Sequence, residues 1–280
     1  MNDSLCGLTV LYNPDESIID NIASYIDSLF HLYVIDNSEE PNFELKSLIE
    51  LNSKVSYYCF DYNSGIAKAL NKGCSMASKD GFSWILTMDQ DSKFINGHFF
   101  DLLKPGMKPD IGIYAASFVN EYDRWVRDYN DDYNEIHFVI TSGNMLNLKA
   151  WNLVGGFEEK LFIDEVDHDF CAKLWLNNFK VLTTKQIFLT HKIGIDIDIK
   201  NVVGTHAPFR HYYMTRNILF ISKRYFLKDF TLTTNRLSVL FKSIARIIIY
   251  YPQKAKYLKY VGLGIWHFFQ KKYGKLNADK

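Results

Sequence analysis

The sequence has no stretch of about 18 or more apolar residues, the length that a helix needs to cross a bilayer. Its first residues, MNDSLCGLTVLYNP, lack the basic and apolar regions of a secretory signal, so we expect a cytoplasmic protein. The four cysteines have no metal-type spacing and indicate reduced thiols. Internal repeats and low-complexity segments are missing too. These absences argue against an integral membrane protein, a disulfide-stapled scaffold and a repeat protein.

The formal net charge is zero, but the two signs are unevenly divided along the chain. Residues 231–280 contain ten Lys or Arg and one Asp, a net charge of +9, so the preceding 230 residues carry −9. The basic segment fits two interpretations. Cationic amphipathic helices bind an anionic membrane surface. Alternatively, these helices pack on the rest of the chain or on a second copy, with their lysines outward. We expect no nucleic-acid partner.

In the first part of the chain, strand-like segments alternate with helix-like ones. The runs GLTVLY, HLYVIDNS, KVSYYCF and FSWILTMDQDS predict strands at 7–12, 31–38, 54–60 and 82–92. Apolar residues at helical spacing predict helices at 16–30 and 63–78. This alternation predicts an α/β fold with a mostly parallel central sheet flanked by helices.

From residue 110 onwards the pattern is less regular. IGIYAASFV and IHFVITSGNMLNL predict strands at 111–119 and 136–148, and KVLTTKQIFLTHKIG contains a strand that runs into His191. FIDEVDHDFCAKLWLNNF predicts a helix at 162–179 with an acidic first turn. Beyond Tyr212 the sequence is mainly helical. We therefore expect a sheet domain at 1–220 and a basic amphipathic helical region at 221–280.

Polar residues stand at or just after the ends of the first four predicted strands: Asn13, Asp36, Asn63 and the pair Asp89 and Asp91. In parallel α/β sheets, ligands bind at the carboxyl ends of the strands. Two carboxylates separated by one residue supply oxygen ligands for a divalent cation. A solvated acidic loop explains the two aspartates equally well, so the pair alone does not distinguish a metal site from such a loop.

His191 ends a later apolar run. An imidazole there binds a manganese-like ion and would complete a site with Asp89 and Asp91. A histidine after a strand is also commonly a structural residue, and this alternative stays open.

The acidic cluster in FIDEVDHDF contains Asp164, Glu165, Asp167 and Asp169. Carboxylates at a helix start are explained by capping and by the helix dipole. Four in six residues exceed that need, and the cluster could supply a general base with a second carboxylate to position it. On a continuous helix, Asp164 and Asp167 would share one face.

Two further segments carry weaker signals. NSGIAKALNKG is neither a phosphate-binding P-loop nor a dinucleotide fingerprint, but Gly65 permits close approach of a ligand to the backbone. FRHYYMTRNILF contains Arg210 and Arg216, and guanidinium groups bind diphosphates in bidentate fashion. A solvated helix face is the alternative for both arginines.

Taken together and in this order, the segments VLYNP, VIDNS, NSGIAKALNKG, LTMDQDS, FIDEVDHDFCAKLW, LTHKIG and RHYYMTRN resemble the inverting glycosyltransferases of family 2. That family has the GT-A fold, the Rossmann-like fold of nucleotide-diphospho-sugar transferases. Within the family, the sequence is most similar to the bacterial rhamnosyltransferases. The resemblance covers residues 6–225.

The resemblance implies a nucleotide-sugar site in which Asp36 accepts a hydrogen bond from the N3–H of uracil or thymine. Ser142, Gly143 and Asn144 would form part of the sugar or acceptor pocket. The residues implied to contact the donor are Tyr12, Asn13, Asp36, Asn63, Gly65, Lys68, Asp89, Arg210 and Arg216.

The same resemblance implies that Asp89, Asp91 and His191 hold Mg²⁺ or Mn²⁺, with Asp91 the more direct ligand. It also implies a base in the acidic cluster, where Asp164, Glu165 and Asp167 are the candidates. Asp164 and Glu165 rank slightly ahead by their place at the expected helix entry.

The implied reaction transfers a sugar with inversion, in cell-surface polysaccharide synthesis, to a glycan or lipid-linked acceptor. We expect dTDP-L-rhamnose as the donor. The alternatives are a UDP-hexose or UDP-galactofuranose, or a non-catalytic scaffold that binds a nucleotide sugar. A peripheral position at the inner face of the cell membrane, and a homodimer, are further expectations.

Overall fold

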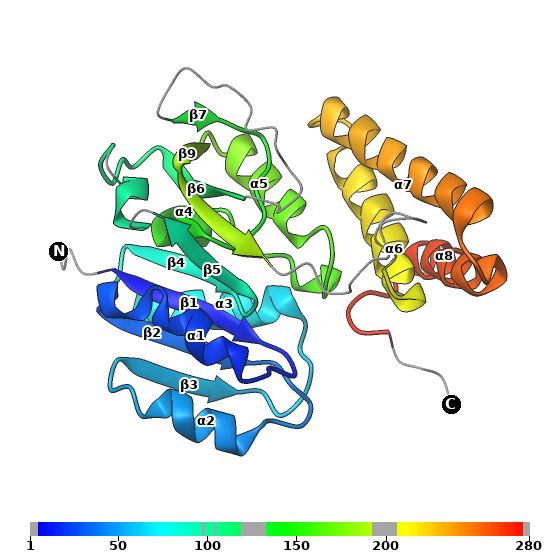
Figure 1. Cartoon of the computed structure of the whole chain (residues 1–280). Coiled ribbons are helices and arrows are strands. Elements are labelled where there is room, and N and C mark those ends of the chain that lie inside the picture. The colour runs from blue at the N-terminus through cyan, green and yellow to red at the C-terminus, as the bar shows by residue number, and fades with distance from the viewer. Residues whose placement is uncertain (1–4, 97–98, 104, 119–132, 192–205, 277–280) are drawn as a thin grey trace. The chain divides into compact units, whose positions relative to one another are not determined.

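The computed structural model describes residues 5–96, 99–103, 105–118, 133–191 and 206–276 (Figure 1). The chain forms two compact units. The sheet unit comprises Met1–Phe157 and Phe170–Lys192, and the helical unit comprises Glu158–Asp169 and Ile193–Lys280. The expected domain boundary near residue 220 falls inside one continuous helix, α6 (Pro208–Tyr225).

The sheet unit is built on one mixed sheet with nine strands in its described part, in the order β3-β2-β1-β4-β8-β6-β9-β5, with β7 paired to β9. The strands are β1 (Cys6–Leu11), β2 (His31–Asp36), β3 (Val55–Cys59), β4 (Trp84–Asp89), β5 (Ser92–Asn96), β6 (Ile111–Phe118), β7 (Asn134–Glu135), β8 (Asn144–Asn147) and β9 (Lys180–His191). The α/β expectation is confirmed.

Strands β1 to β4 are parallel to one another, and their carboxyl ends meet at one edge of the sheet. Leu11 on β1 pairs with Asp36 on β2, and Val10 pairs with Asp89 on β4. Every residue of β1 is buried, as expected for a strand covered on both faces. The register therefore gathers the polar strand ends that the sequence singled out.

Short helices cover this sheet. They are α1 (Ser17–Ala23), α2 (Phe43–Glu50), α3 (Ile66–Lys79) and α4 (Leu148–Leu153), with 3₁₀ turns at Ile26–Ser28 and Phe99–Leu103. Helix α3 contacts β1 and β2. Gly73 permits this close packing, because a Cβ there would come within 2.2 Å of Leu8 Cδ1.

The strand predicted at 136–148 is wrong for most of its length, since β8 begins only at Asn144. The physical reason is Gly143, whose φ of +70° is a left-handed conformation that breaks an extended run. Gly143 N–H donates to Thr87 O at 2.7 Å, so the preceding loop is anchored at the end of β4.

The helical unit contains α6, α7 (Phe230–Tyr250) and α8 (Lys254–Phe269), and α6 contacts both of the others. Pro208 starts α6, and Asp229 caps α7 by accepting from Leu232 N–H at 2.8 Å. The expectation of a helical C-terminal region is confirmed. In the described residues, no helix is long and apolar enough to cross a membrane.

The helix predicted from residue 162 begins later, as α5 (Val166–Leu176). Phe162, Asp164 and Glu165 have φ of +67°, +63° and +65°, values that right-handed helix cannot accommodate. Asp164 therefore precedes α5 and shares no helical face with Asp167, which corrects the expected i,i+3 arrangement.

Candidate functional site

Gln90 ties together two of the strand ends in the sheet unit. Its side-chain Oε1 accepts from Tyr12 N–H at 2.8 Å, and its Nε2 donates to Tyr12 O at 3.2 Å. Its own carbonyl accepts from Asn21 Nδ2 at 2.7 Å. The middle residue of Asp-Gln-Asp thus holds the loop after β4 against the loop after β1, where Asn13 has a φ of +45°. Sequence reasoning gave Gln90 no role, because this pairing joins residues 78 positions apart.

Asp89 and Asp91 lie on either side of Gln90, between β4 and β5. The backbone N–H of Asp89 donates to Ser142 Oγ at 3.0 Å, so Ser142 fixes the end of β4. Ser92, next to Asp91, pairs with His191 across the antiparallel β5–β9 ladder. The backbone therefore places His191 opposite Ser92, the residue that follows Asp91.

The residues at this loop suit a hard divalent cation. Mg²⁺ and its analogues are bound by one or two carboxylates together with substrate phosphates, rather than by a complete protein cage. Among the residues that the structure describes, no three His, Cys, Asp or Glu side chains surround one point. Asp89 and Asp91 fit an ion that a nucleoside diphosphate helps to coordinate.

Asp36, at the end of β2, is fully buried. Its carboxylate accepts from Ser38 N–H at 2.8 Å and from the Tyr57 hydroxyl at 2.6 Å. Burial, with the neighbouring Asp36 charge, raises the pKa of Tyr57 above its ordinary value, so the phenol stays a donor. Each carboxylate oxygen has a second lone pair for a further donor.

Asn37 organises the entry to α3, a role that sequence reasoning missed. Its Oδ1 accepts from Ser64 N–H at 2.7 Å, and its Nδ2 donates to Asn63 Oδ1 at 3.2 Å. Asn63 Oδ1 also accepts from the N–H of Gly65, whose φ is +87°. Asn63, Ser64 and Gly65 are thereby held at the carboxyl edge of the sheet. The signal in the sequence was the run Asp-Asn-Ser directly after a strand.

Lys68 lies on α3 among aromatic side chains. Its Nζ donates to the Tyr62 hydroxyl at 3.0 Å and lies 5.8 Å from the centre of the Phe60 ring. A cation–π environment of this kind holds the ammonium near the strand edge. The neighbouring Asn71 has a structural role instead, because it bonds the backbone of Phe157 in both directions.

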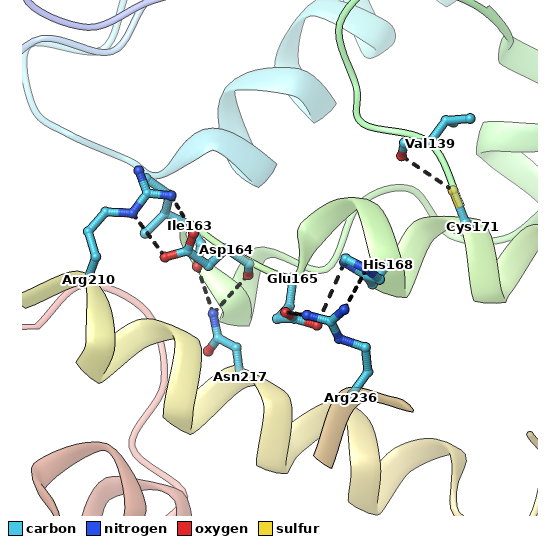
Figure 2. A network of polar contacts seen from close by, with 9 residues as sticks. All are labelled: Val139, Ile163, Asp164, Glu165, His168, Cys171, Arg210, Asn217 and Arg236. Atoms are coloured by element: carbon cyan, nitrogen blue, oxygen red, sulfur yellow. Dashed lines mark hydrogen bonds and ion pairs between the residues drawn. The ribbon is translucent and has the colours of Figure 1, made fainter. Parts of the chain in front are cut away.

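In the helical unit, residues 162–167 form what we call the acidic turn. Its backbone is held by Asn217 on α6, whose Nδ2 contacts the carbonyls of Ile163 and Asp164 at 2.7 and 3.0 Å (Figure 2). The same Nδ2 lies 2.8 Å from the carbonyl of Leu161, directly before the turn. Positive φ at non-glycine residues is strained, and such strain clusters at functional sites. The turn is therefore a second candidate for the functional site.

Arg216 supports the acidic turn from within the helical unit. It is fully buried, and all five of its N–H donors are engaged. The acceptors are Asn217 Oδ1, the Tyr212 hydroxyl and the carbonyls of Gly274, Lys160 and Leu161. No N–H is left for a phosphate, so we do not carry Arg216 into the donor site.

Arg210 and Asp164 bind one another, although the sequence assigned them to different roles. The guanidinium reaches both carboxylate oxygens, with Nε 3.3 Å from Oδ2 and Nη2 hydrogen-bonded to Oδ1 (Figure 2). This bidentate ion pair places a permanent positive charge on a candidate base.

Glu165 is paired through one carboxylate oxygen with Arg236 on α7, whose Nη1 also lies 2.9 Å from His168 Nε2 (Figure 2). The Glu165 side chain is only 5% exposed. Its pKa is raised to about 7, because the rise due to burial exceeds the lowering by Arg236 and the nearby Asp164 adds a smaller rise. The His168 pKa is lowered to about 3 by burial and by Arg236, so that ring is neutral.

Asp167 and Asp169 lie in the first turn of α5. Asp169 is fully buried and accepts from Arg224 and from the Tyr225 hydroxyl, both at 2.8 Å, which makes it structural. Asp167 is half-buried. The structure thus separates the four carboxylates. Asp164 and Glu165 have positive φ and are bound to arginines, Asp169 is buried, and Asp167 is partly exposed on regular helix.

Comparison with known proteins assigns the family. Residues 8–184 match glycosyl transferase family 2. The chain therefore belongs to glycosyl transferase family 2 and is a glycosyltransferase, as the order of its motifs predicted. It is 28% identical over 278 residues, 91% of each chain, to the dTDP-rhamnosyl transferase RfbF of Shigella flexneri.

Solved structures agree on the fold. The mannosyltransferase PcManGT from Pyrobaculum calidifontis, in complex with GDP-Man and Mn²⁺, superimposes with a TM-score of 0.61 at 13% identity, covering 96% of this chain and 88% of that one. GalNAc-T7 with UDP, GalNAc and Mn²⁺ gives 0.56 at 12% identity over 67% of this chain. This chain covers only 43% of that longer protein. At such identities the likeness establishes the fold alone.

Replacing Arg216 by Met removes the shared donor of five acceptors in the helical unit. We expect the free energy of unfolding to fall by about 3–5 kcal/mol, the cost of breaking a buried polar network. Arg246→Met is the matched control, since Arg246 is exposed on α7, and should change it by less than about 0.5 kcal/mol. Urea denaturation followed by circular dichroism measures both. Equal midpoints for the two variants would contradict the buried role.

Proposed function

We propose that this glycosyltransferase transfers L-rhamnose from dTDP-L-rhamnose, with inversion and with a divalent cation, to a glycan or lipid-linked acceptor. The observation that carries the proposal is the similarity to a dTDP-rhamnosyl transferase along 91% of both chains. The gathered strand ends of the sheet unit support it, because they combine carboxylates, amides and an open glycine backbone at one sheet edge.

In this proposal the sheet unit binds the donor. Asp36 accepts from the pyrimidine N3–H with a remaining lone pair, and Asn63 and Gly65 lie along the nucleoside. Tyr12, Asn13 and Lys68 complete the donor site. The hydrogen bonds of Gln90 and Asn37 fix these loops before the donor arrives, which lowers the ordering cost of binding.

Asp89 and Asp91 would hold Mg²⁺ or Mn²⁺, with His191 as a further ligand. When bound, the cation neutralises charge on the leaving diphosphate. Arg210 remains a candidate for the same diphosphate, provided that the donor displaces it from Asp164.

A carboxylate of the acidic turn acts as the general base. It takes the proton of the acceptor hydroxyl as that oxygen bonds to the anomeric carbon, while the bond from that carbon to the diphosphate oxygen breaks. A single displacement inverts the configuration and needs no covalent glycosyl-enzyme. The candidates are Asp164, Glu165 and Asp167. We favour Asp167, which is half-buried in the first turn of α5, because Asp164 and Glu165 are each ion-paired with an arginine.

We place the protein at the inner face of the cell membrane, bound through its C-terminal helices. On α8, Leu258, Ile265, Trp266 and Phe269 are exposed and recur at helical spacing, while lysines lie at both ends of the helix. Aromatic side chains beside lysines suit the interface of an anionic bilayer. This position would bring the enzyme to a lipid-linked acceptor.

Other donors and another class of protein remain as alternatives to be tested. A UDP-hexose or UDP-galactofuranose presents the same N3–H to Asp36. A non-catalytic scaffold would bind a nucleotide sugar without turning it over.

The donor and the metal site are tested together by a thermal-shift panel of nucleotide sugars with and without Mn²⁺, followed by turnover assays. We expect dTDP-L-rhamnose to give the largest Mn²⁺-dependent rise in Tm, because a ligand stabilises the folded state in proportion to its affinity. Asp91→Asn should lose that dependence and about a hundredfold or more of the turnover. The neighbouring Lys93→Gln is the control. Unchanged turnover in Asp91→Asn would refute the metal assignment, and binding without turnover would favour the scaffold.

The base is identified by three isosteric variants of the acidic turn. Asp167→Asn should lower kcat by about 10²–10⁴-fold, the usual contribution of a general base, with the donor KM nearly unchanged. Asp164→Asn and Glu165→Gln should lower it less. If Asp167→Asn keeps its kcat while one of the others loses it, the base is that other residue.

Membrane binding is measured by flotation with vesicles containing anionic phospholipid. Substituting Trp266 and Phe269 with Ser should release the protein into the soluble fraction, since these side chains are 60% and 73% exposed. Phe43→Ser, at an exposed position on α2, is the matched control. Flotation of the double variant equal to wild type would exclude this surface, and a shift in oligomeric state instead would identify it as a contact between copies.

A further inference from the structure

Arg236, on helix α7, binds a side chain of the acidic turn. The Arg236 side chain is 14% exposed and donates to Glu165 Oε1, while its Nη1 lies 2.9 Å from His168 Nε2 (Figure 2). This guanidinium therefore joins α7 to Glu165, which directly precedes α5, and to His168, in the first turn of α5.

The arginine also sets the tautomer of the histidine. A guanidinium can only donate, so Nε2 of the neutral His168 must accept and the ring proton lies on Nδ1. His168 Nδ1 lies 3.7 Å from Glu165 Oε2, and that oxygen makes no hydrogen bond within the described residues. Glu165 is thus held firmly through one oxygen, while the other faces the Nδ1–H.

Glu165 and His168 stand on either side of Asp167 in the sequence. The carbonyl of Glu165 accepts from Asp169 N–H at 3.0 Å, which is the first helical bond of this turn. Since the residues on both sides of Asp167 are held by the same guanidinium, the stretch of backbone that carries Asp167 is fixed as well.

Stability alone gives a weak reason for this arrangement. Replacing a buried ion pair by apolar residues is often neutral or stabilising, because the desolvation of both charges opposes their attraction. The left-handed φ of Glu165 adds strain that a purely structural turn could avoid with glycine. Both costs are explained if the arrangement serves the reaction.

We propose that Arg236 is a positioning residue for glycosyl transfer, which fixes Glu165 and His168 and, through them, the stretch of backbone that carries Asp167. The inference rests on the proposed function, in which a carboxylate of the acidic turn takes the acceptor proton. It gives the basic C-terminal region a part in the reaction as well as in membrane binding.

The test compares the full-length wild type with Arg236→Met, Arg236→Lys and Arg246→Met, each with dTDP-L-rhamnose and Mn²⁺. Arg236→Met should lower kcat by about tenfold to a hundredfold with the donor KM within about threefold, since misplacement of a catalytic group affects the chemical step. Arg236→Lys keeps the charge but cannot reach both partners at once, so a loss of about three- to tenfold is expected. Arg246→Met, on the same helix, should match the wild type.

The pH profile supplies a readout that a purely structural role would not move. The charged groups facing Glu165 are Arg236 from α7 and Asp164 from the turn, while His168 from α5 is neutral. As pH falls through about 7, Glu165 takes up a proton and its pair with Arg236 is lost, so kcat should decline on this acid limb. In Arg236→Met that pair is absent at every pH, so the acid limb should no longer lie near pH 7.

The outcomes separate the inference from the function on which it rests. No turnover by the wild type with any nucleotide sugar would overturn the proposed function, and this inference with it. Normal wild-type turnover with undiminished kcat in folded Arg236→Met overturns the inference alone, as does a kcat loss without movement of the acid limb. If Arg236→Met fails to fold, the kcat of Arg236→Lys decides, and a value equal to that of the wild type overturns the inference.

Discussion

The acidic turn depends on side chains of α6 and α7 that hold its backbone in a left-handed conformation. Strained φ values of this kind cost of the order of 1–3 kcal/mol each. Asn217 engages the carbonyls of Ile163 and Asp164 in the turn, and Arg216 engages that of Leu161 directly before it. Arg210 and Arg236 engage its carboxylates. These contacts offset the strain and fix where α5 begins, and therefore where Asp167 lies.

The sheet unit meets a different constraint. Four parallel strands end at one edge, and the loops that follow them must be held in fixed positions. Side-chain amides solve it: Gln90 bonds both backbone groups of Tyr12, and Asn37 holds the entry to α3. Amides suit this task since each combines a donor with an acceptor. The two aspartates beside Gln90 are then presented on a loop whose position is already set.

Much of this could be predicted from the sequence. Hydrophobic runs located the first four strands to within about three residues, and the polar residues after them indicated the ligand edge. Local patterns could not reveal the late start of α5, because acidic residues before an apolar run also resemble a helix start. The roles of Arg216 and Arg236 depend on partners more than 50 residues away, and no spacing rule reports such contacts.

The central claim is that the Asp-Gln-Asp loop binds a cation together with a nucleoside diphosphate. Anomalous diffraction at the manganese edge, from crystals grown with dTDP and Mn²⁺, tests it most directly. We predict one manganese peak bonded to Asp91 and to oxygens of the diphosphate. Diphosphate bound in the site with manganese absent, or located away from both aspartates, would contradict the account.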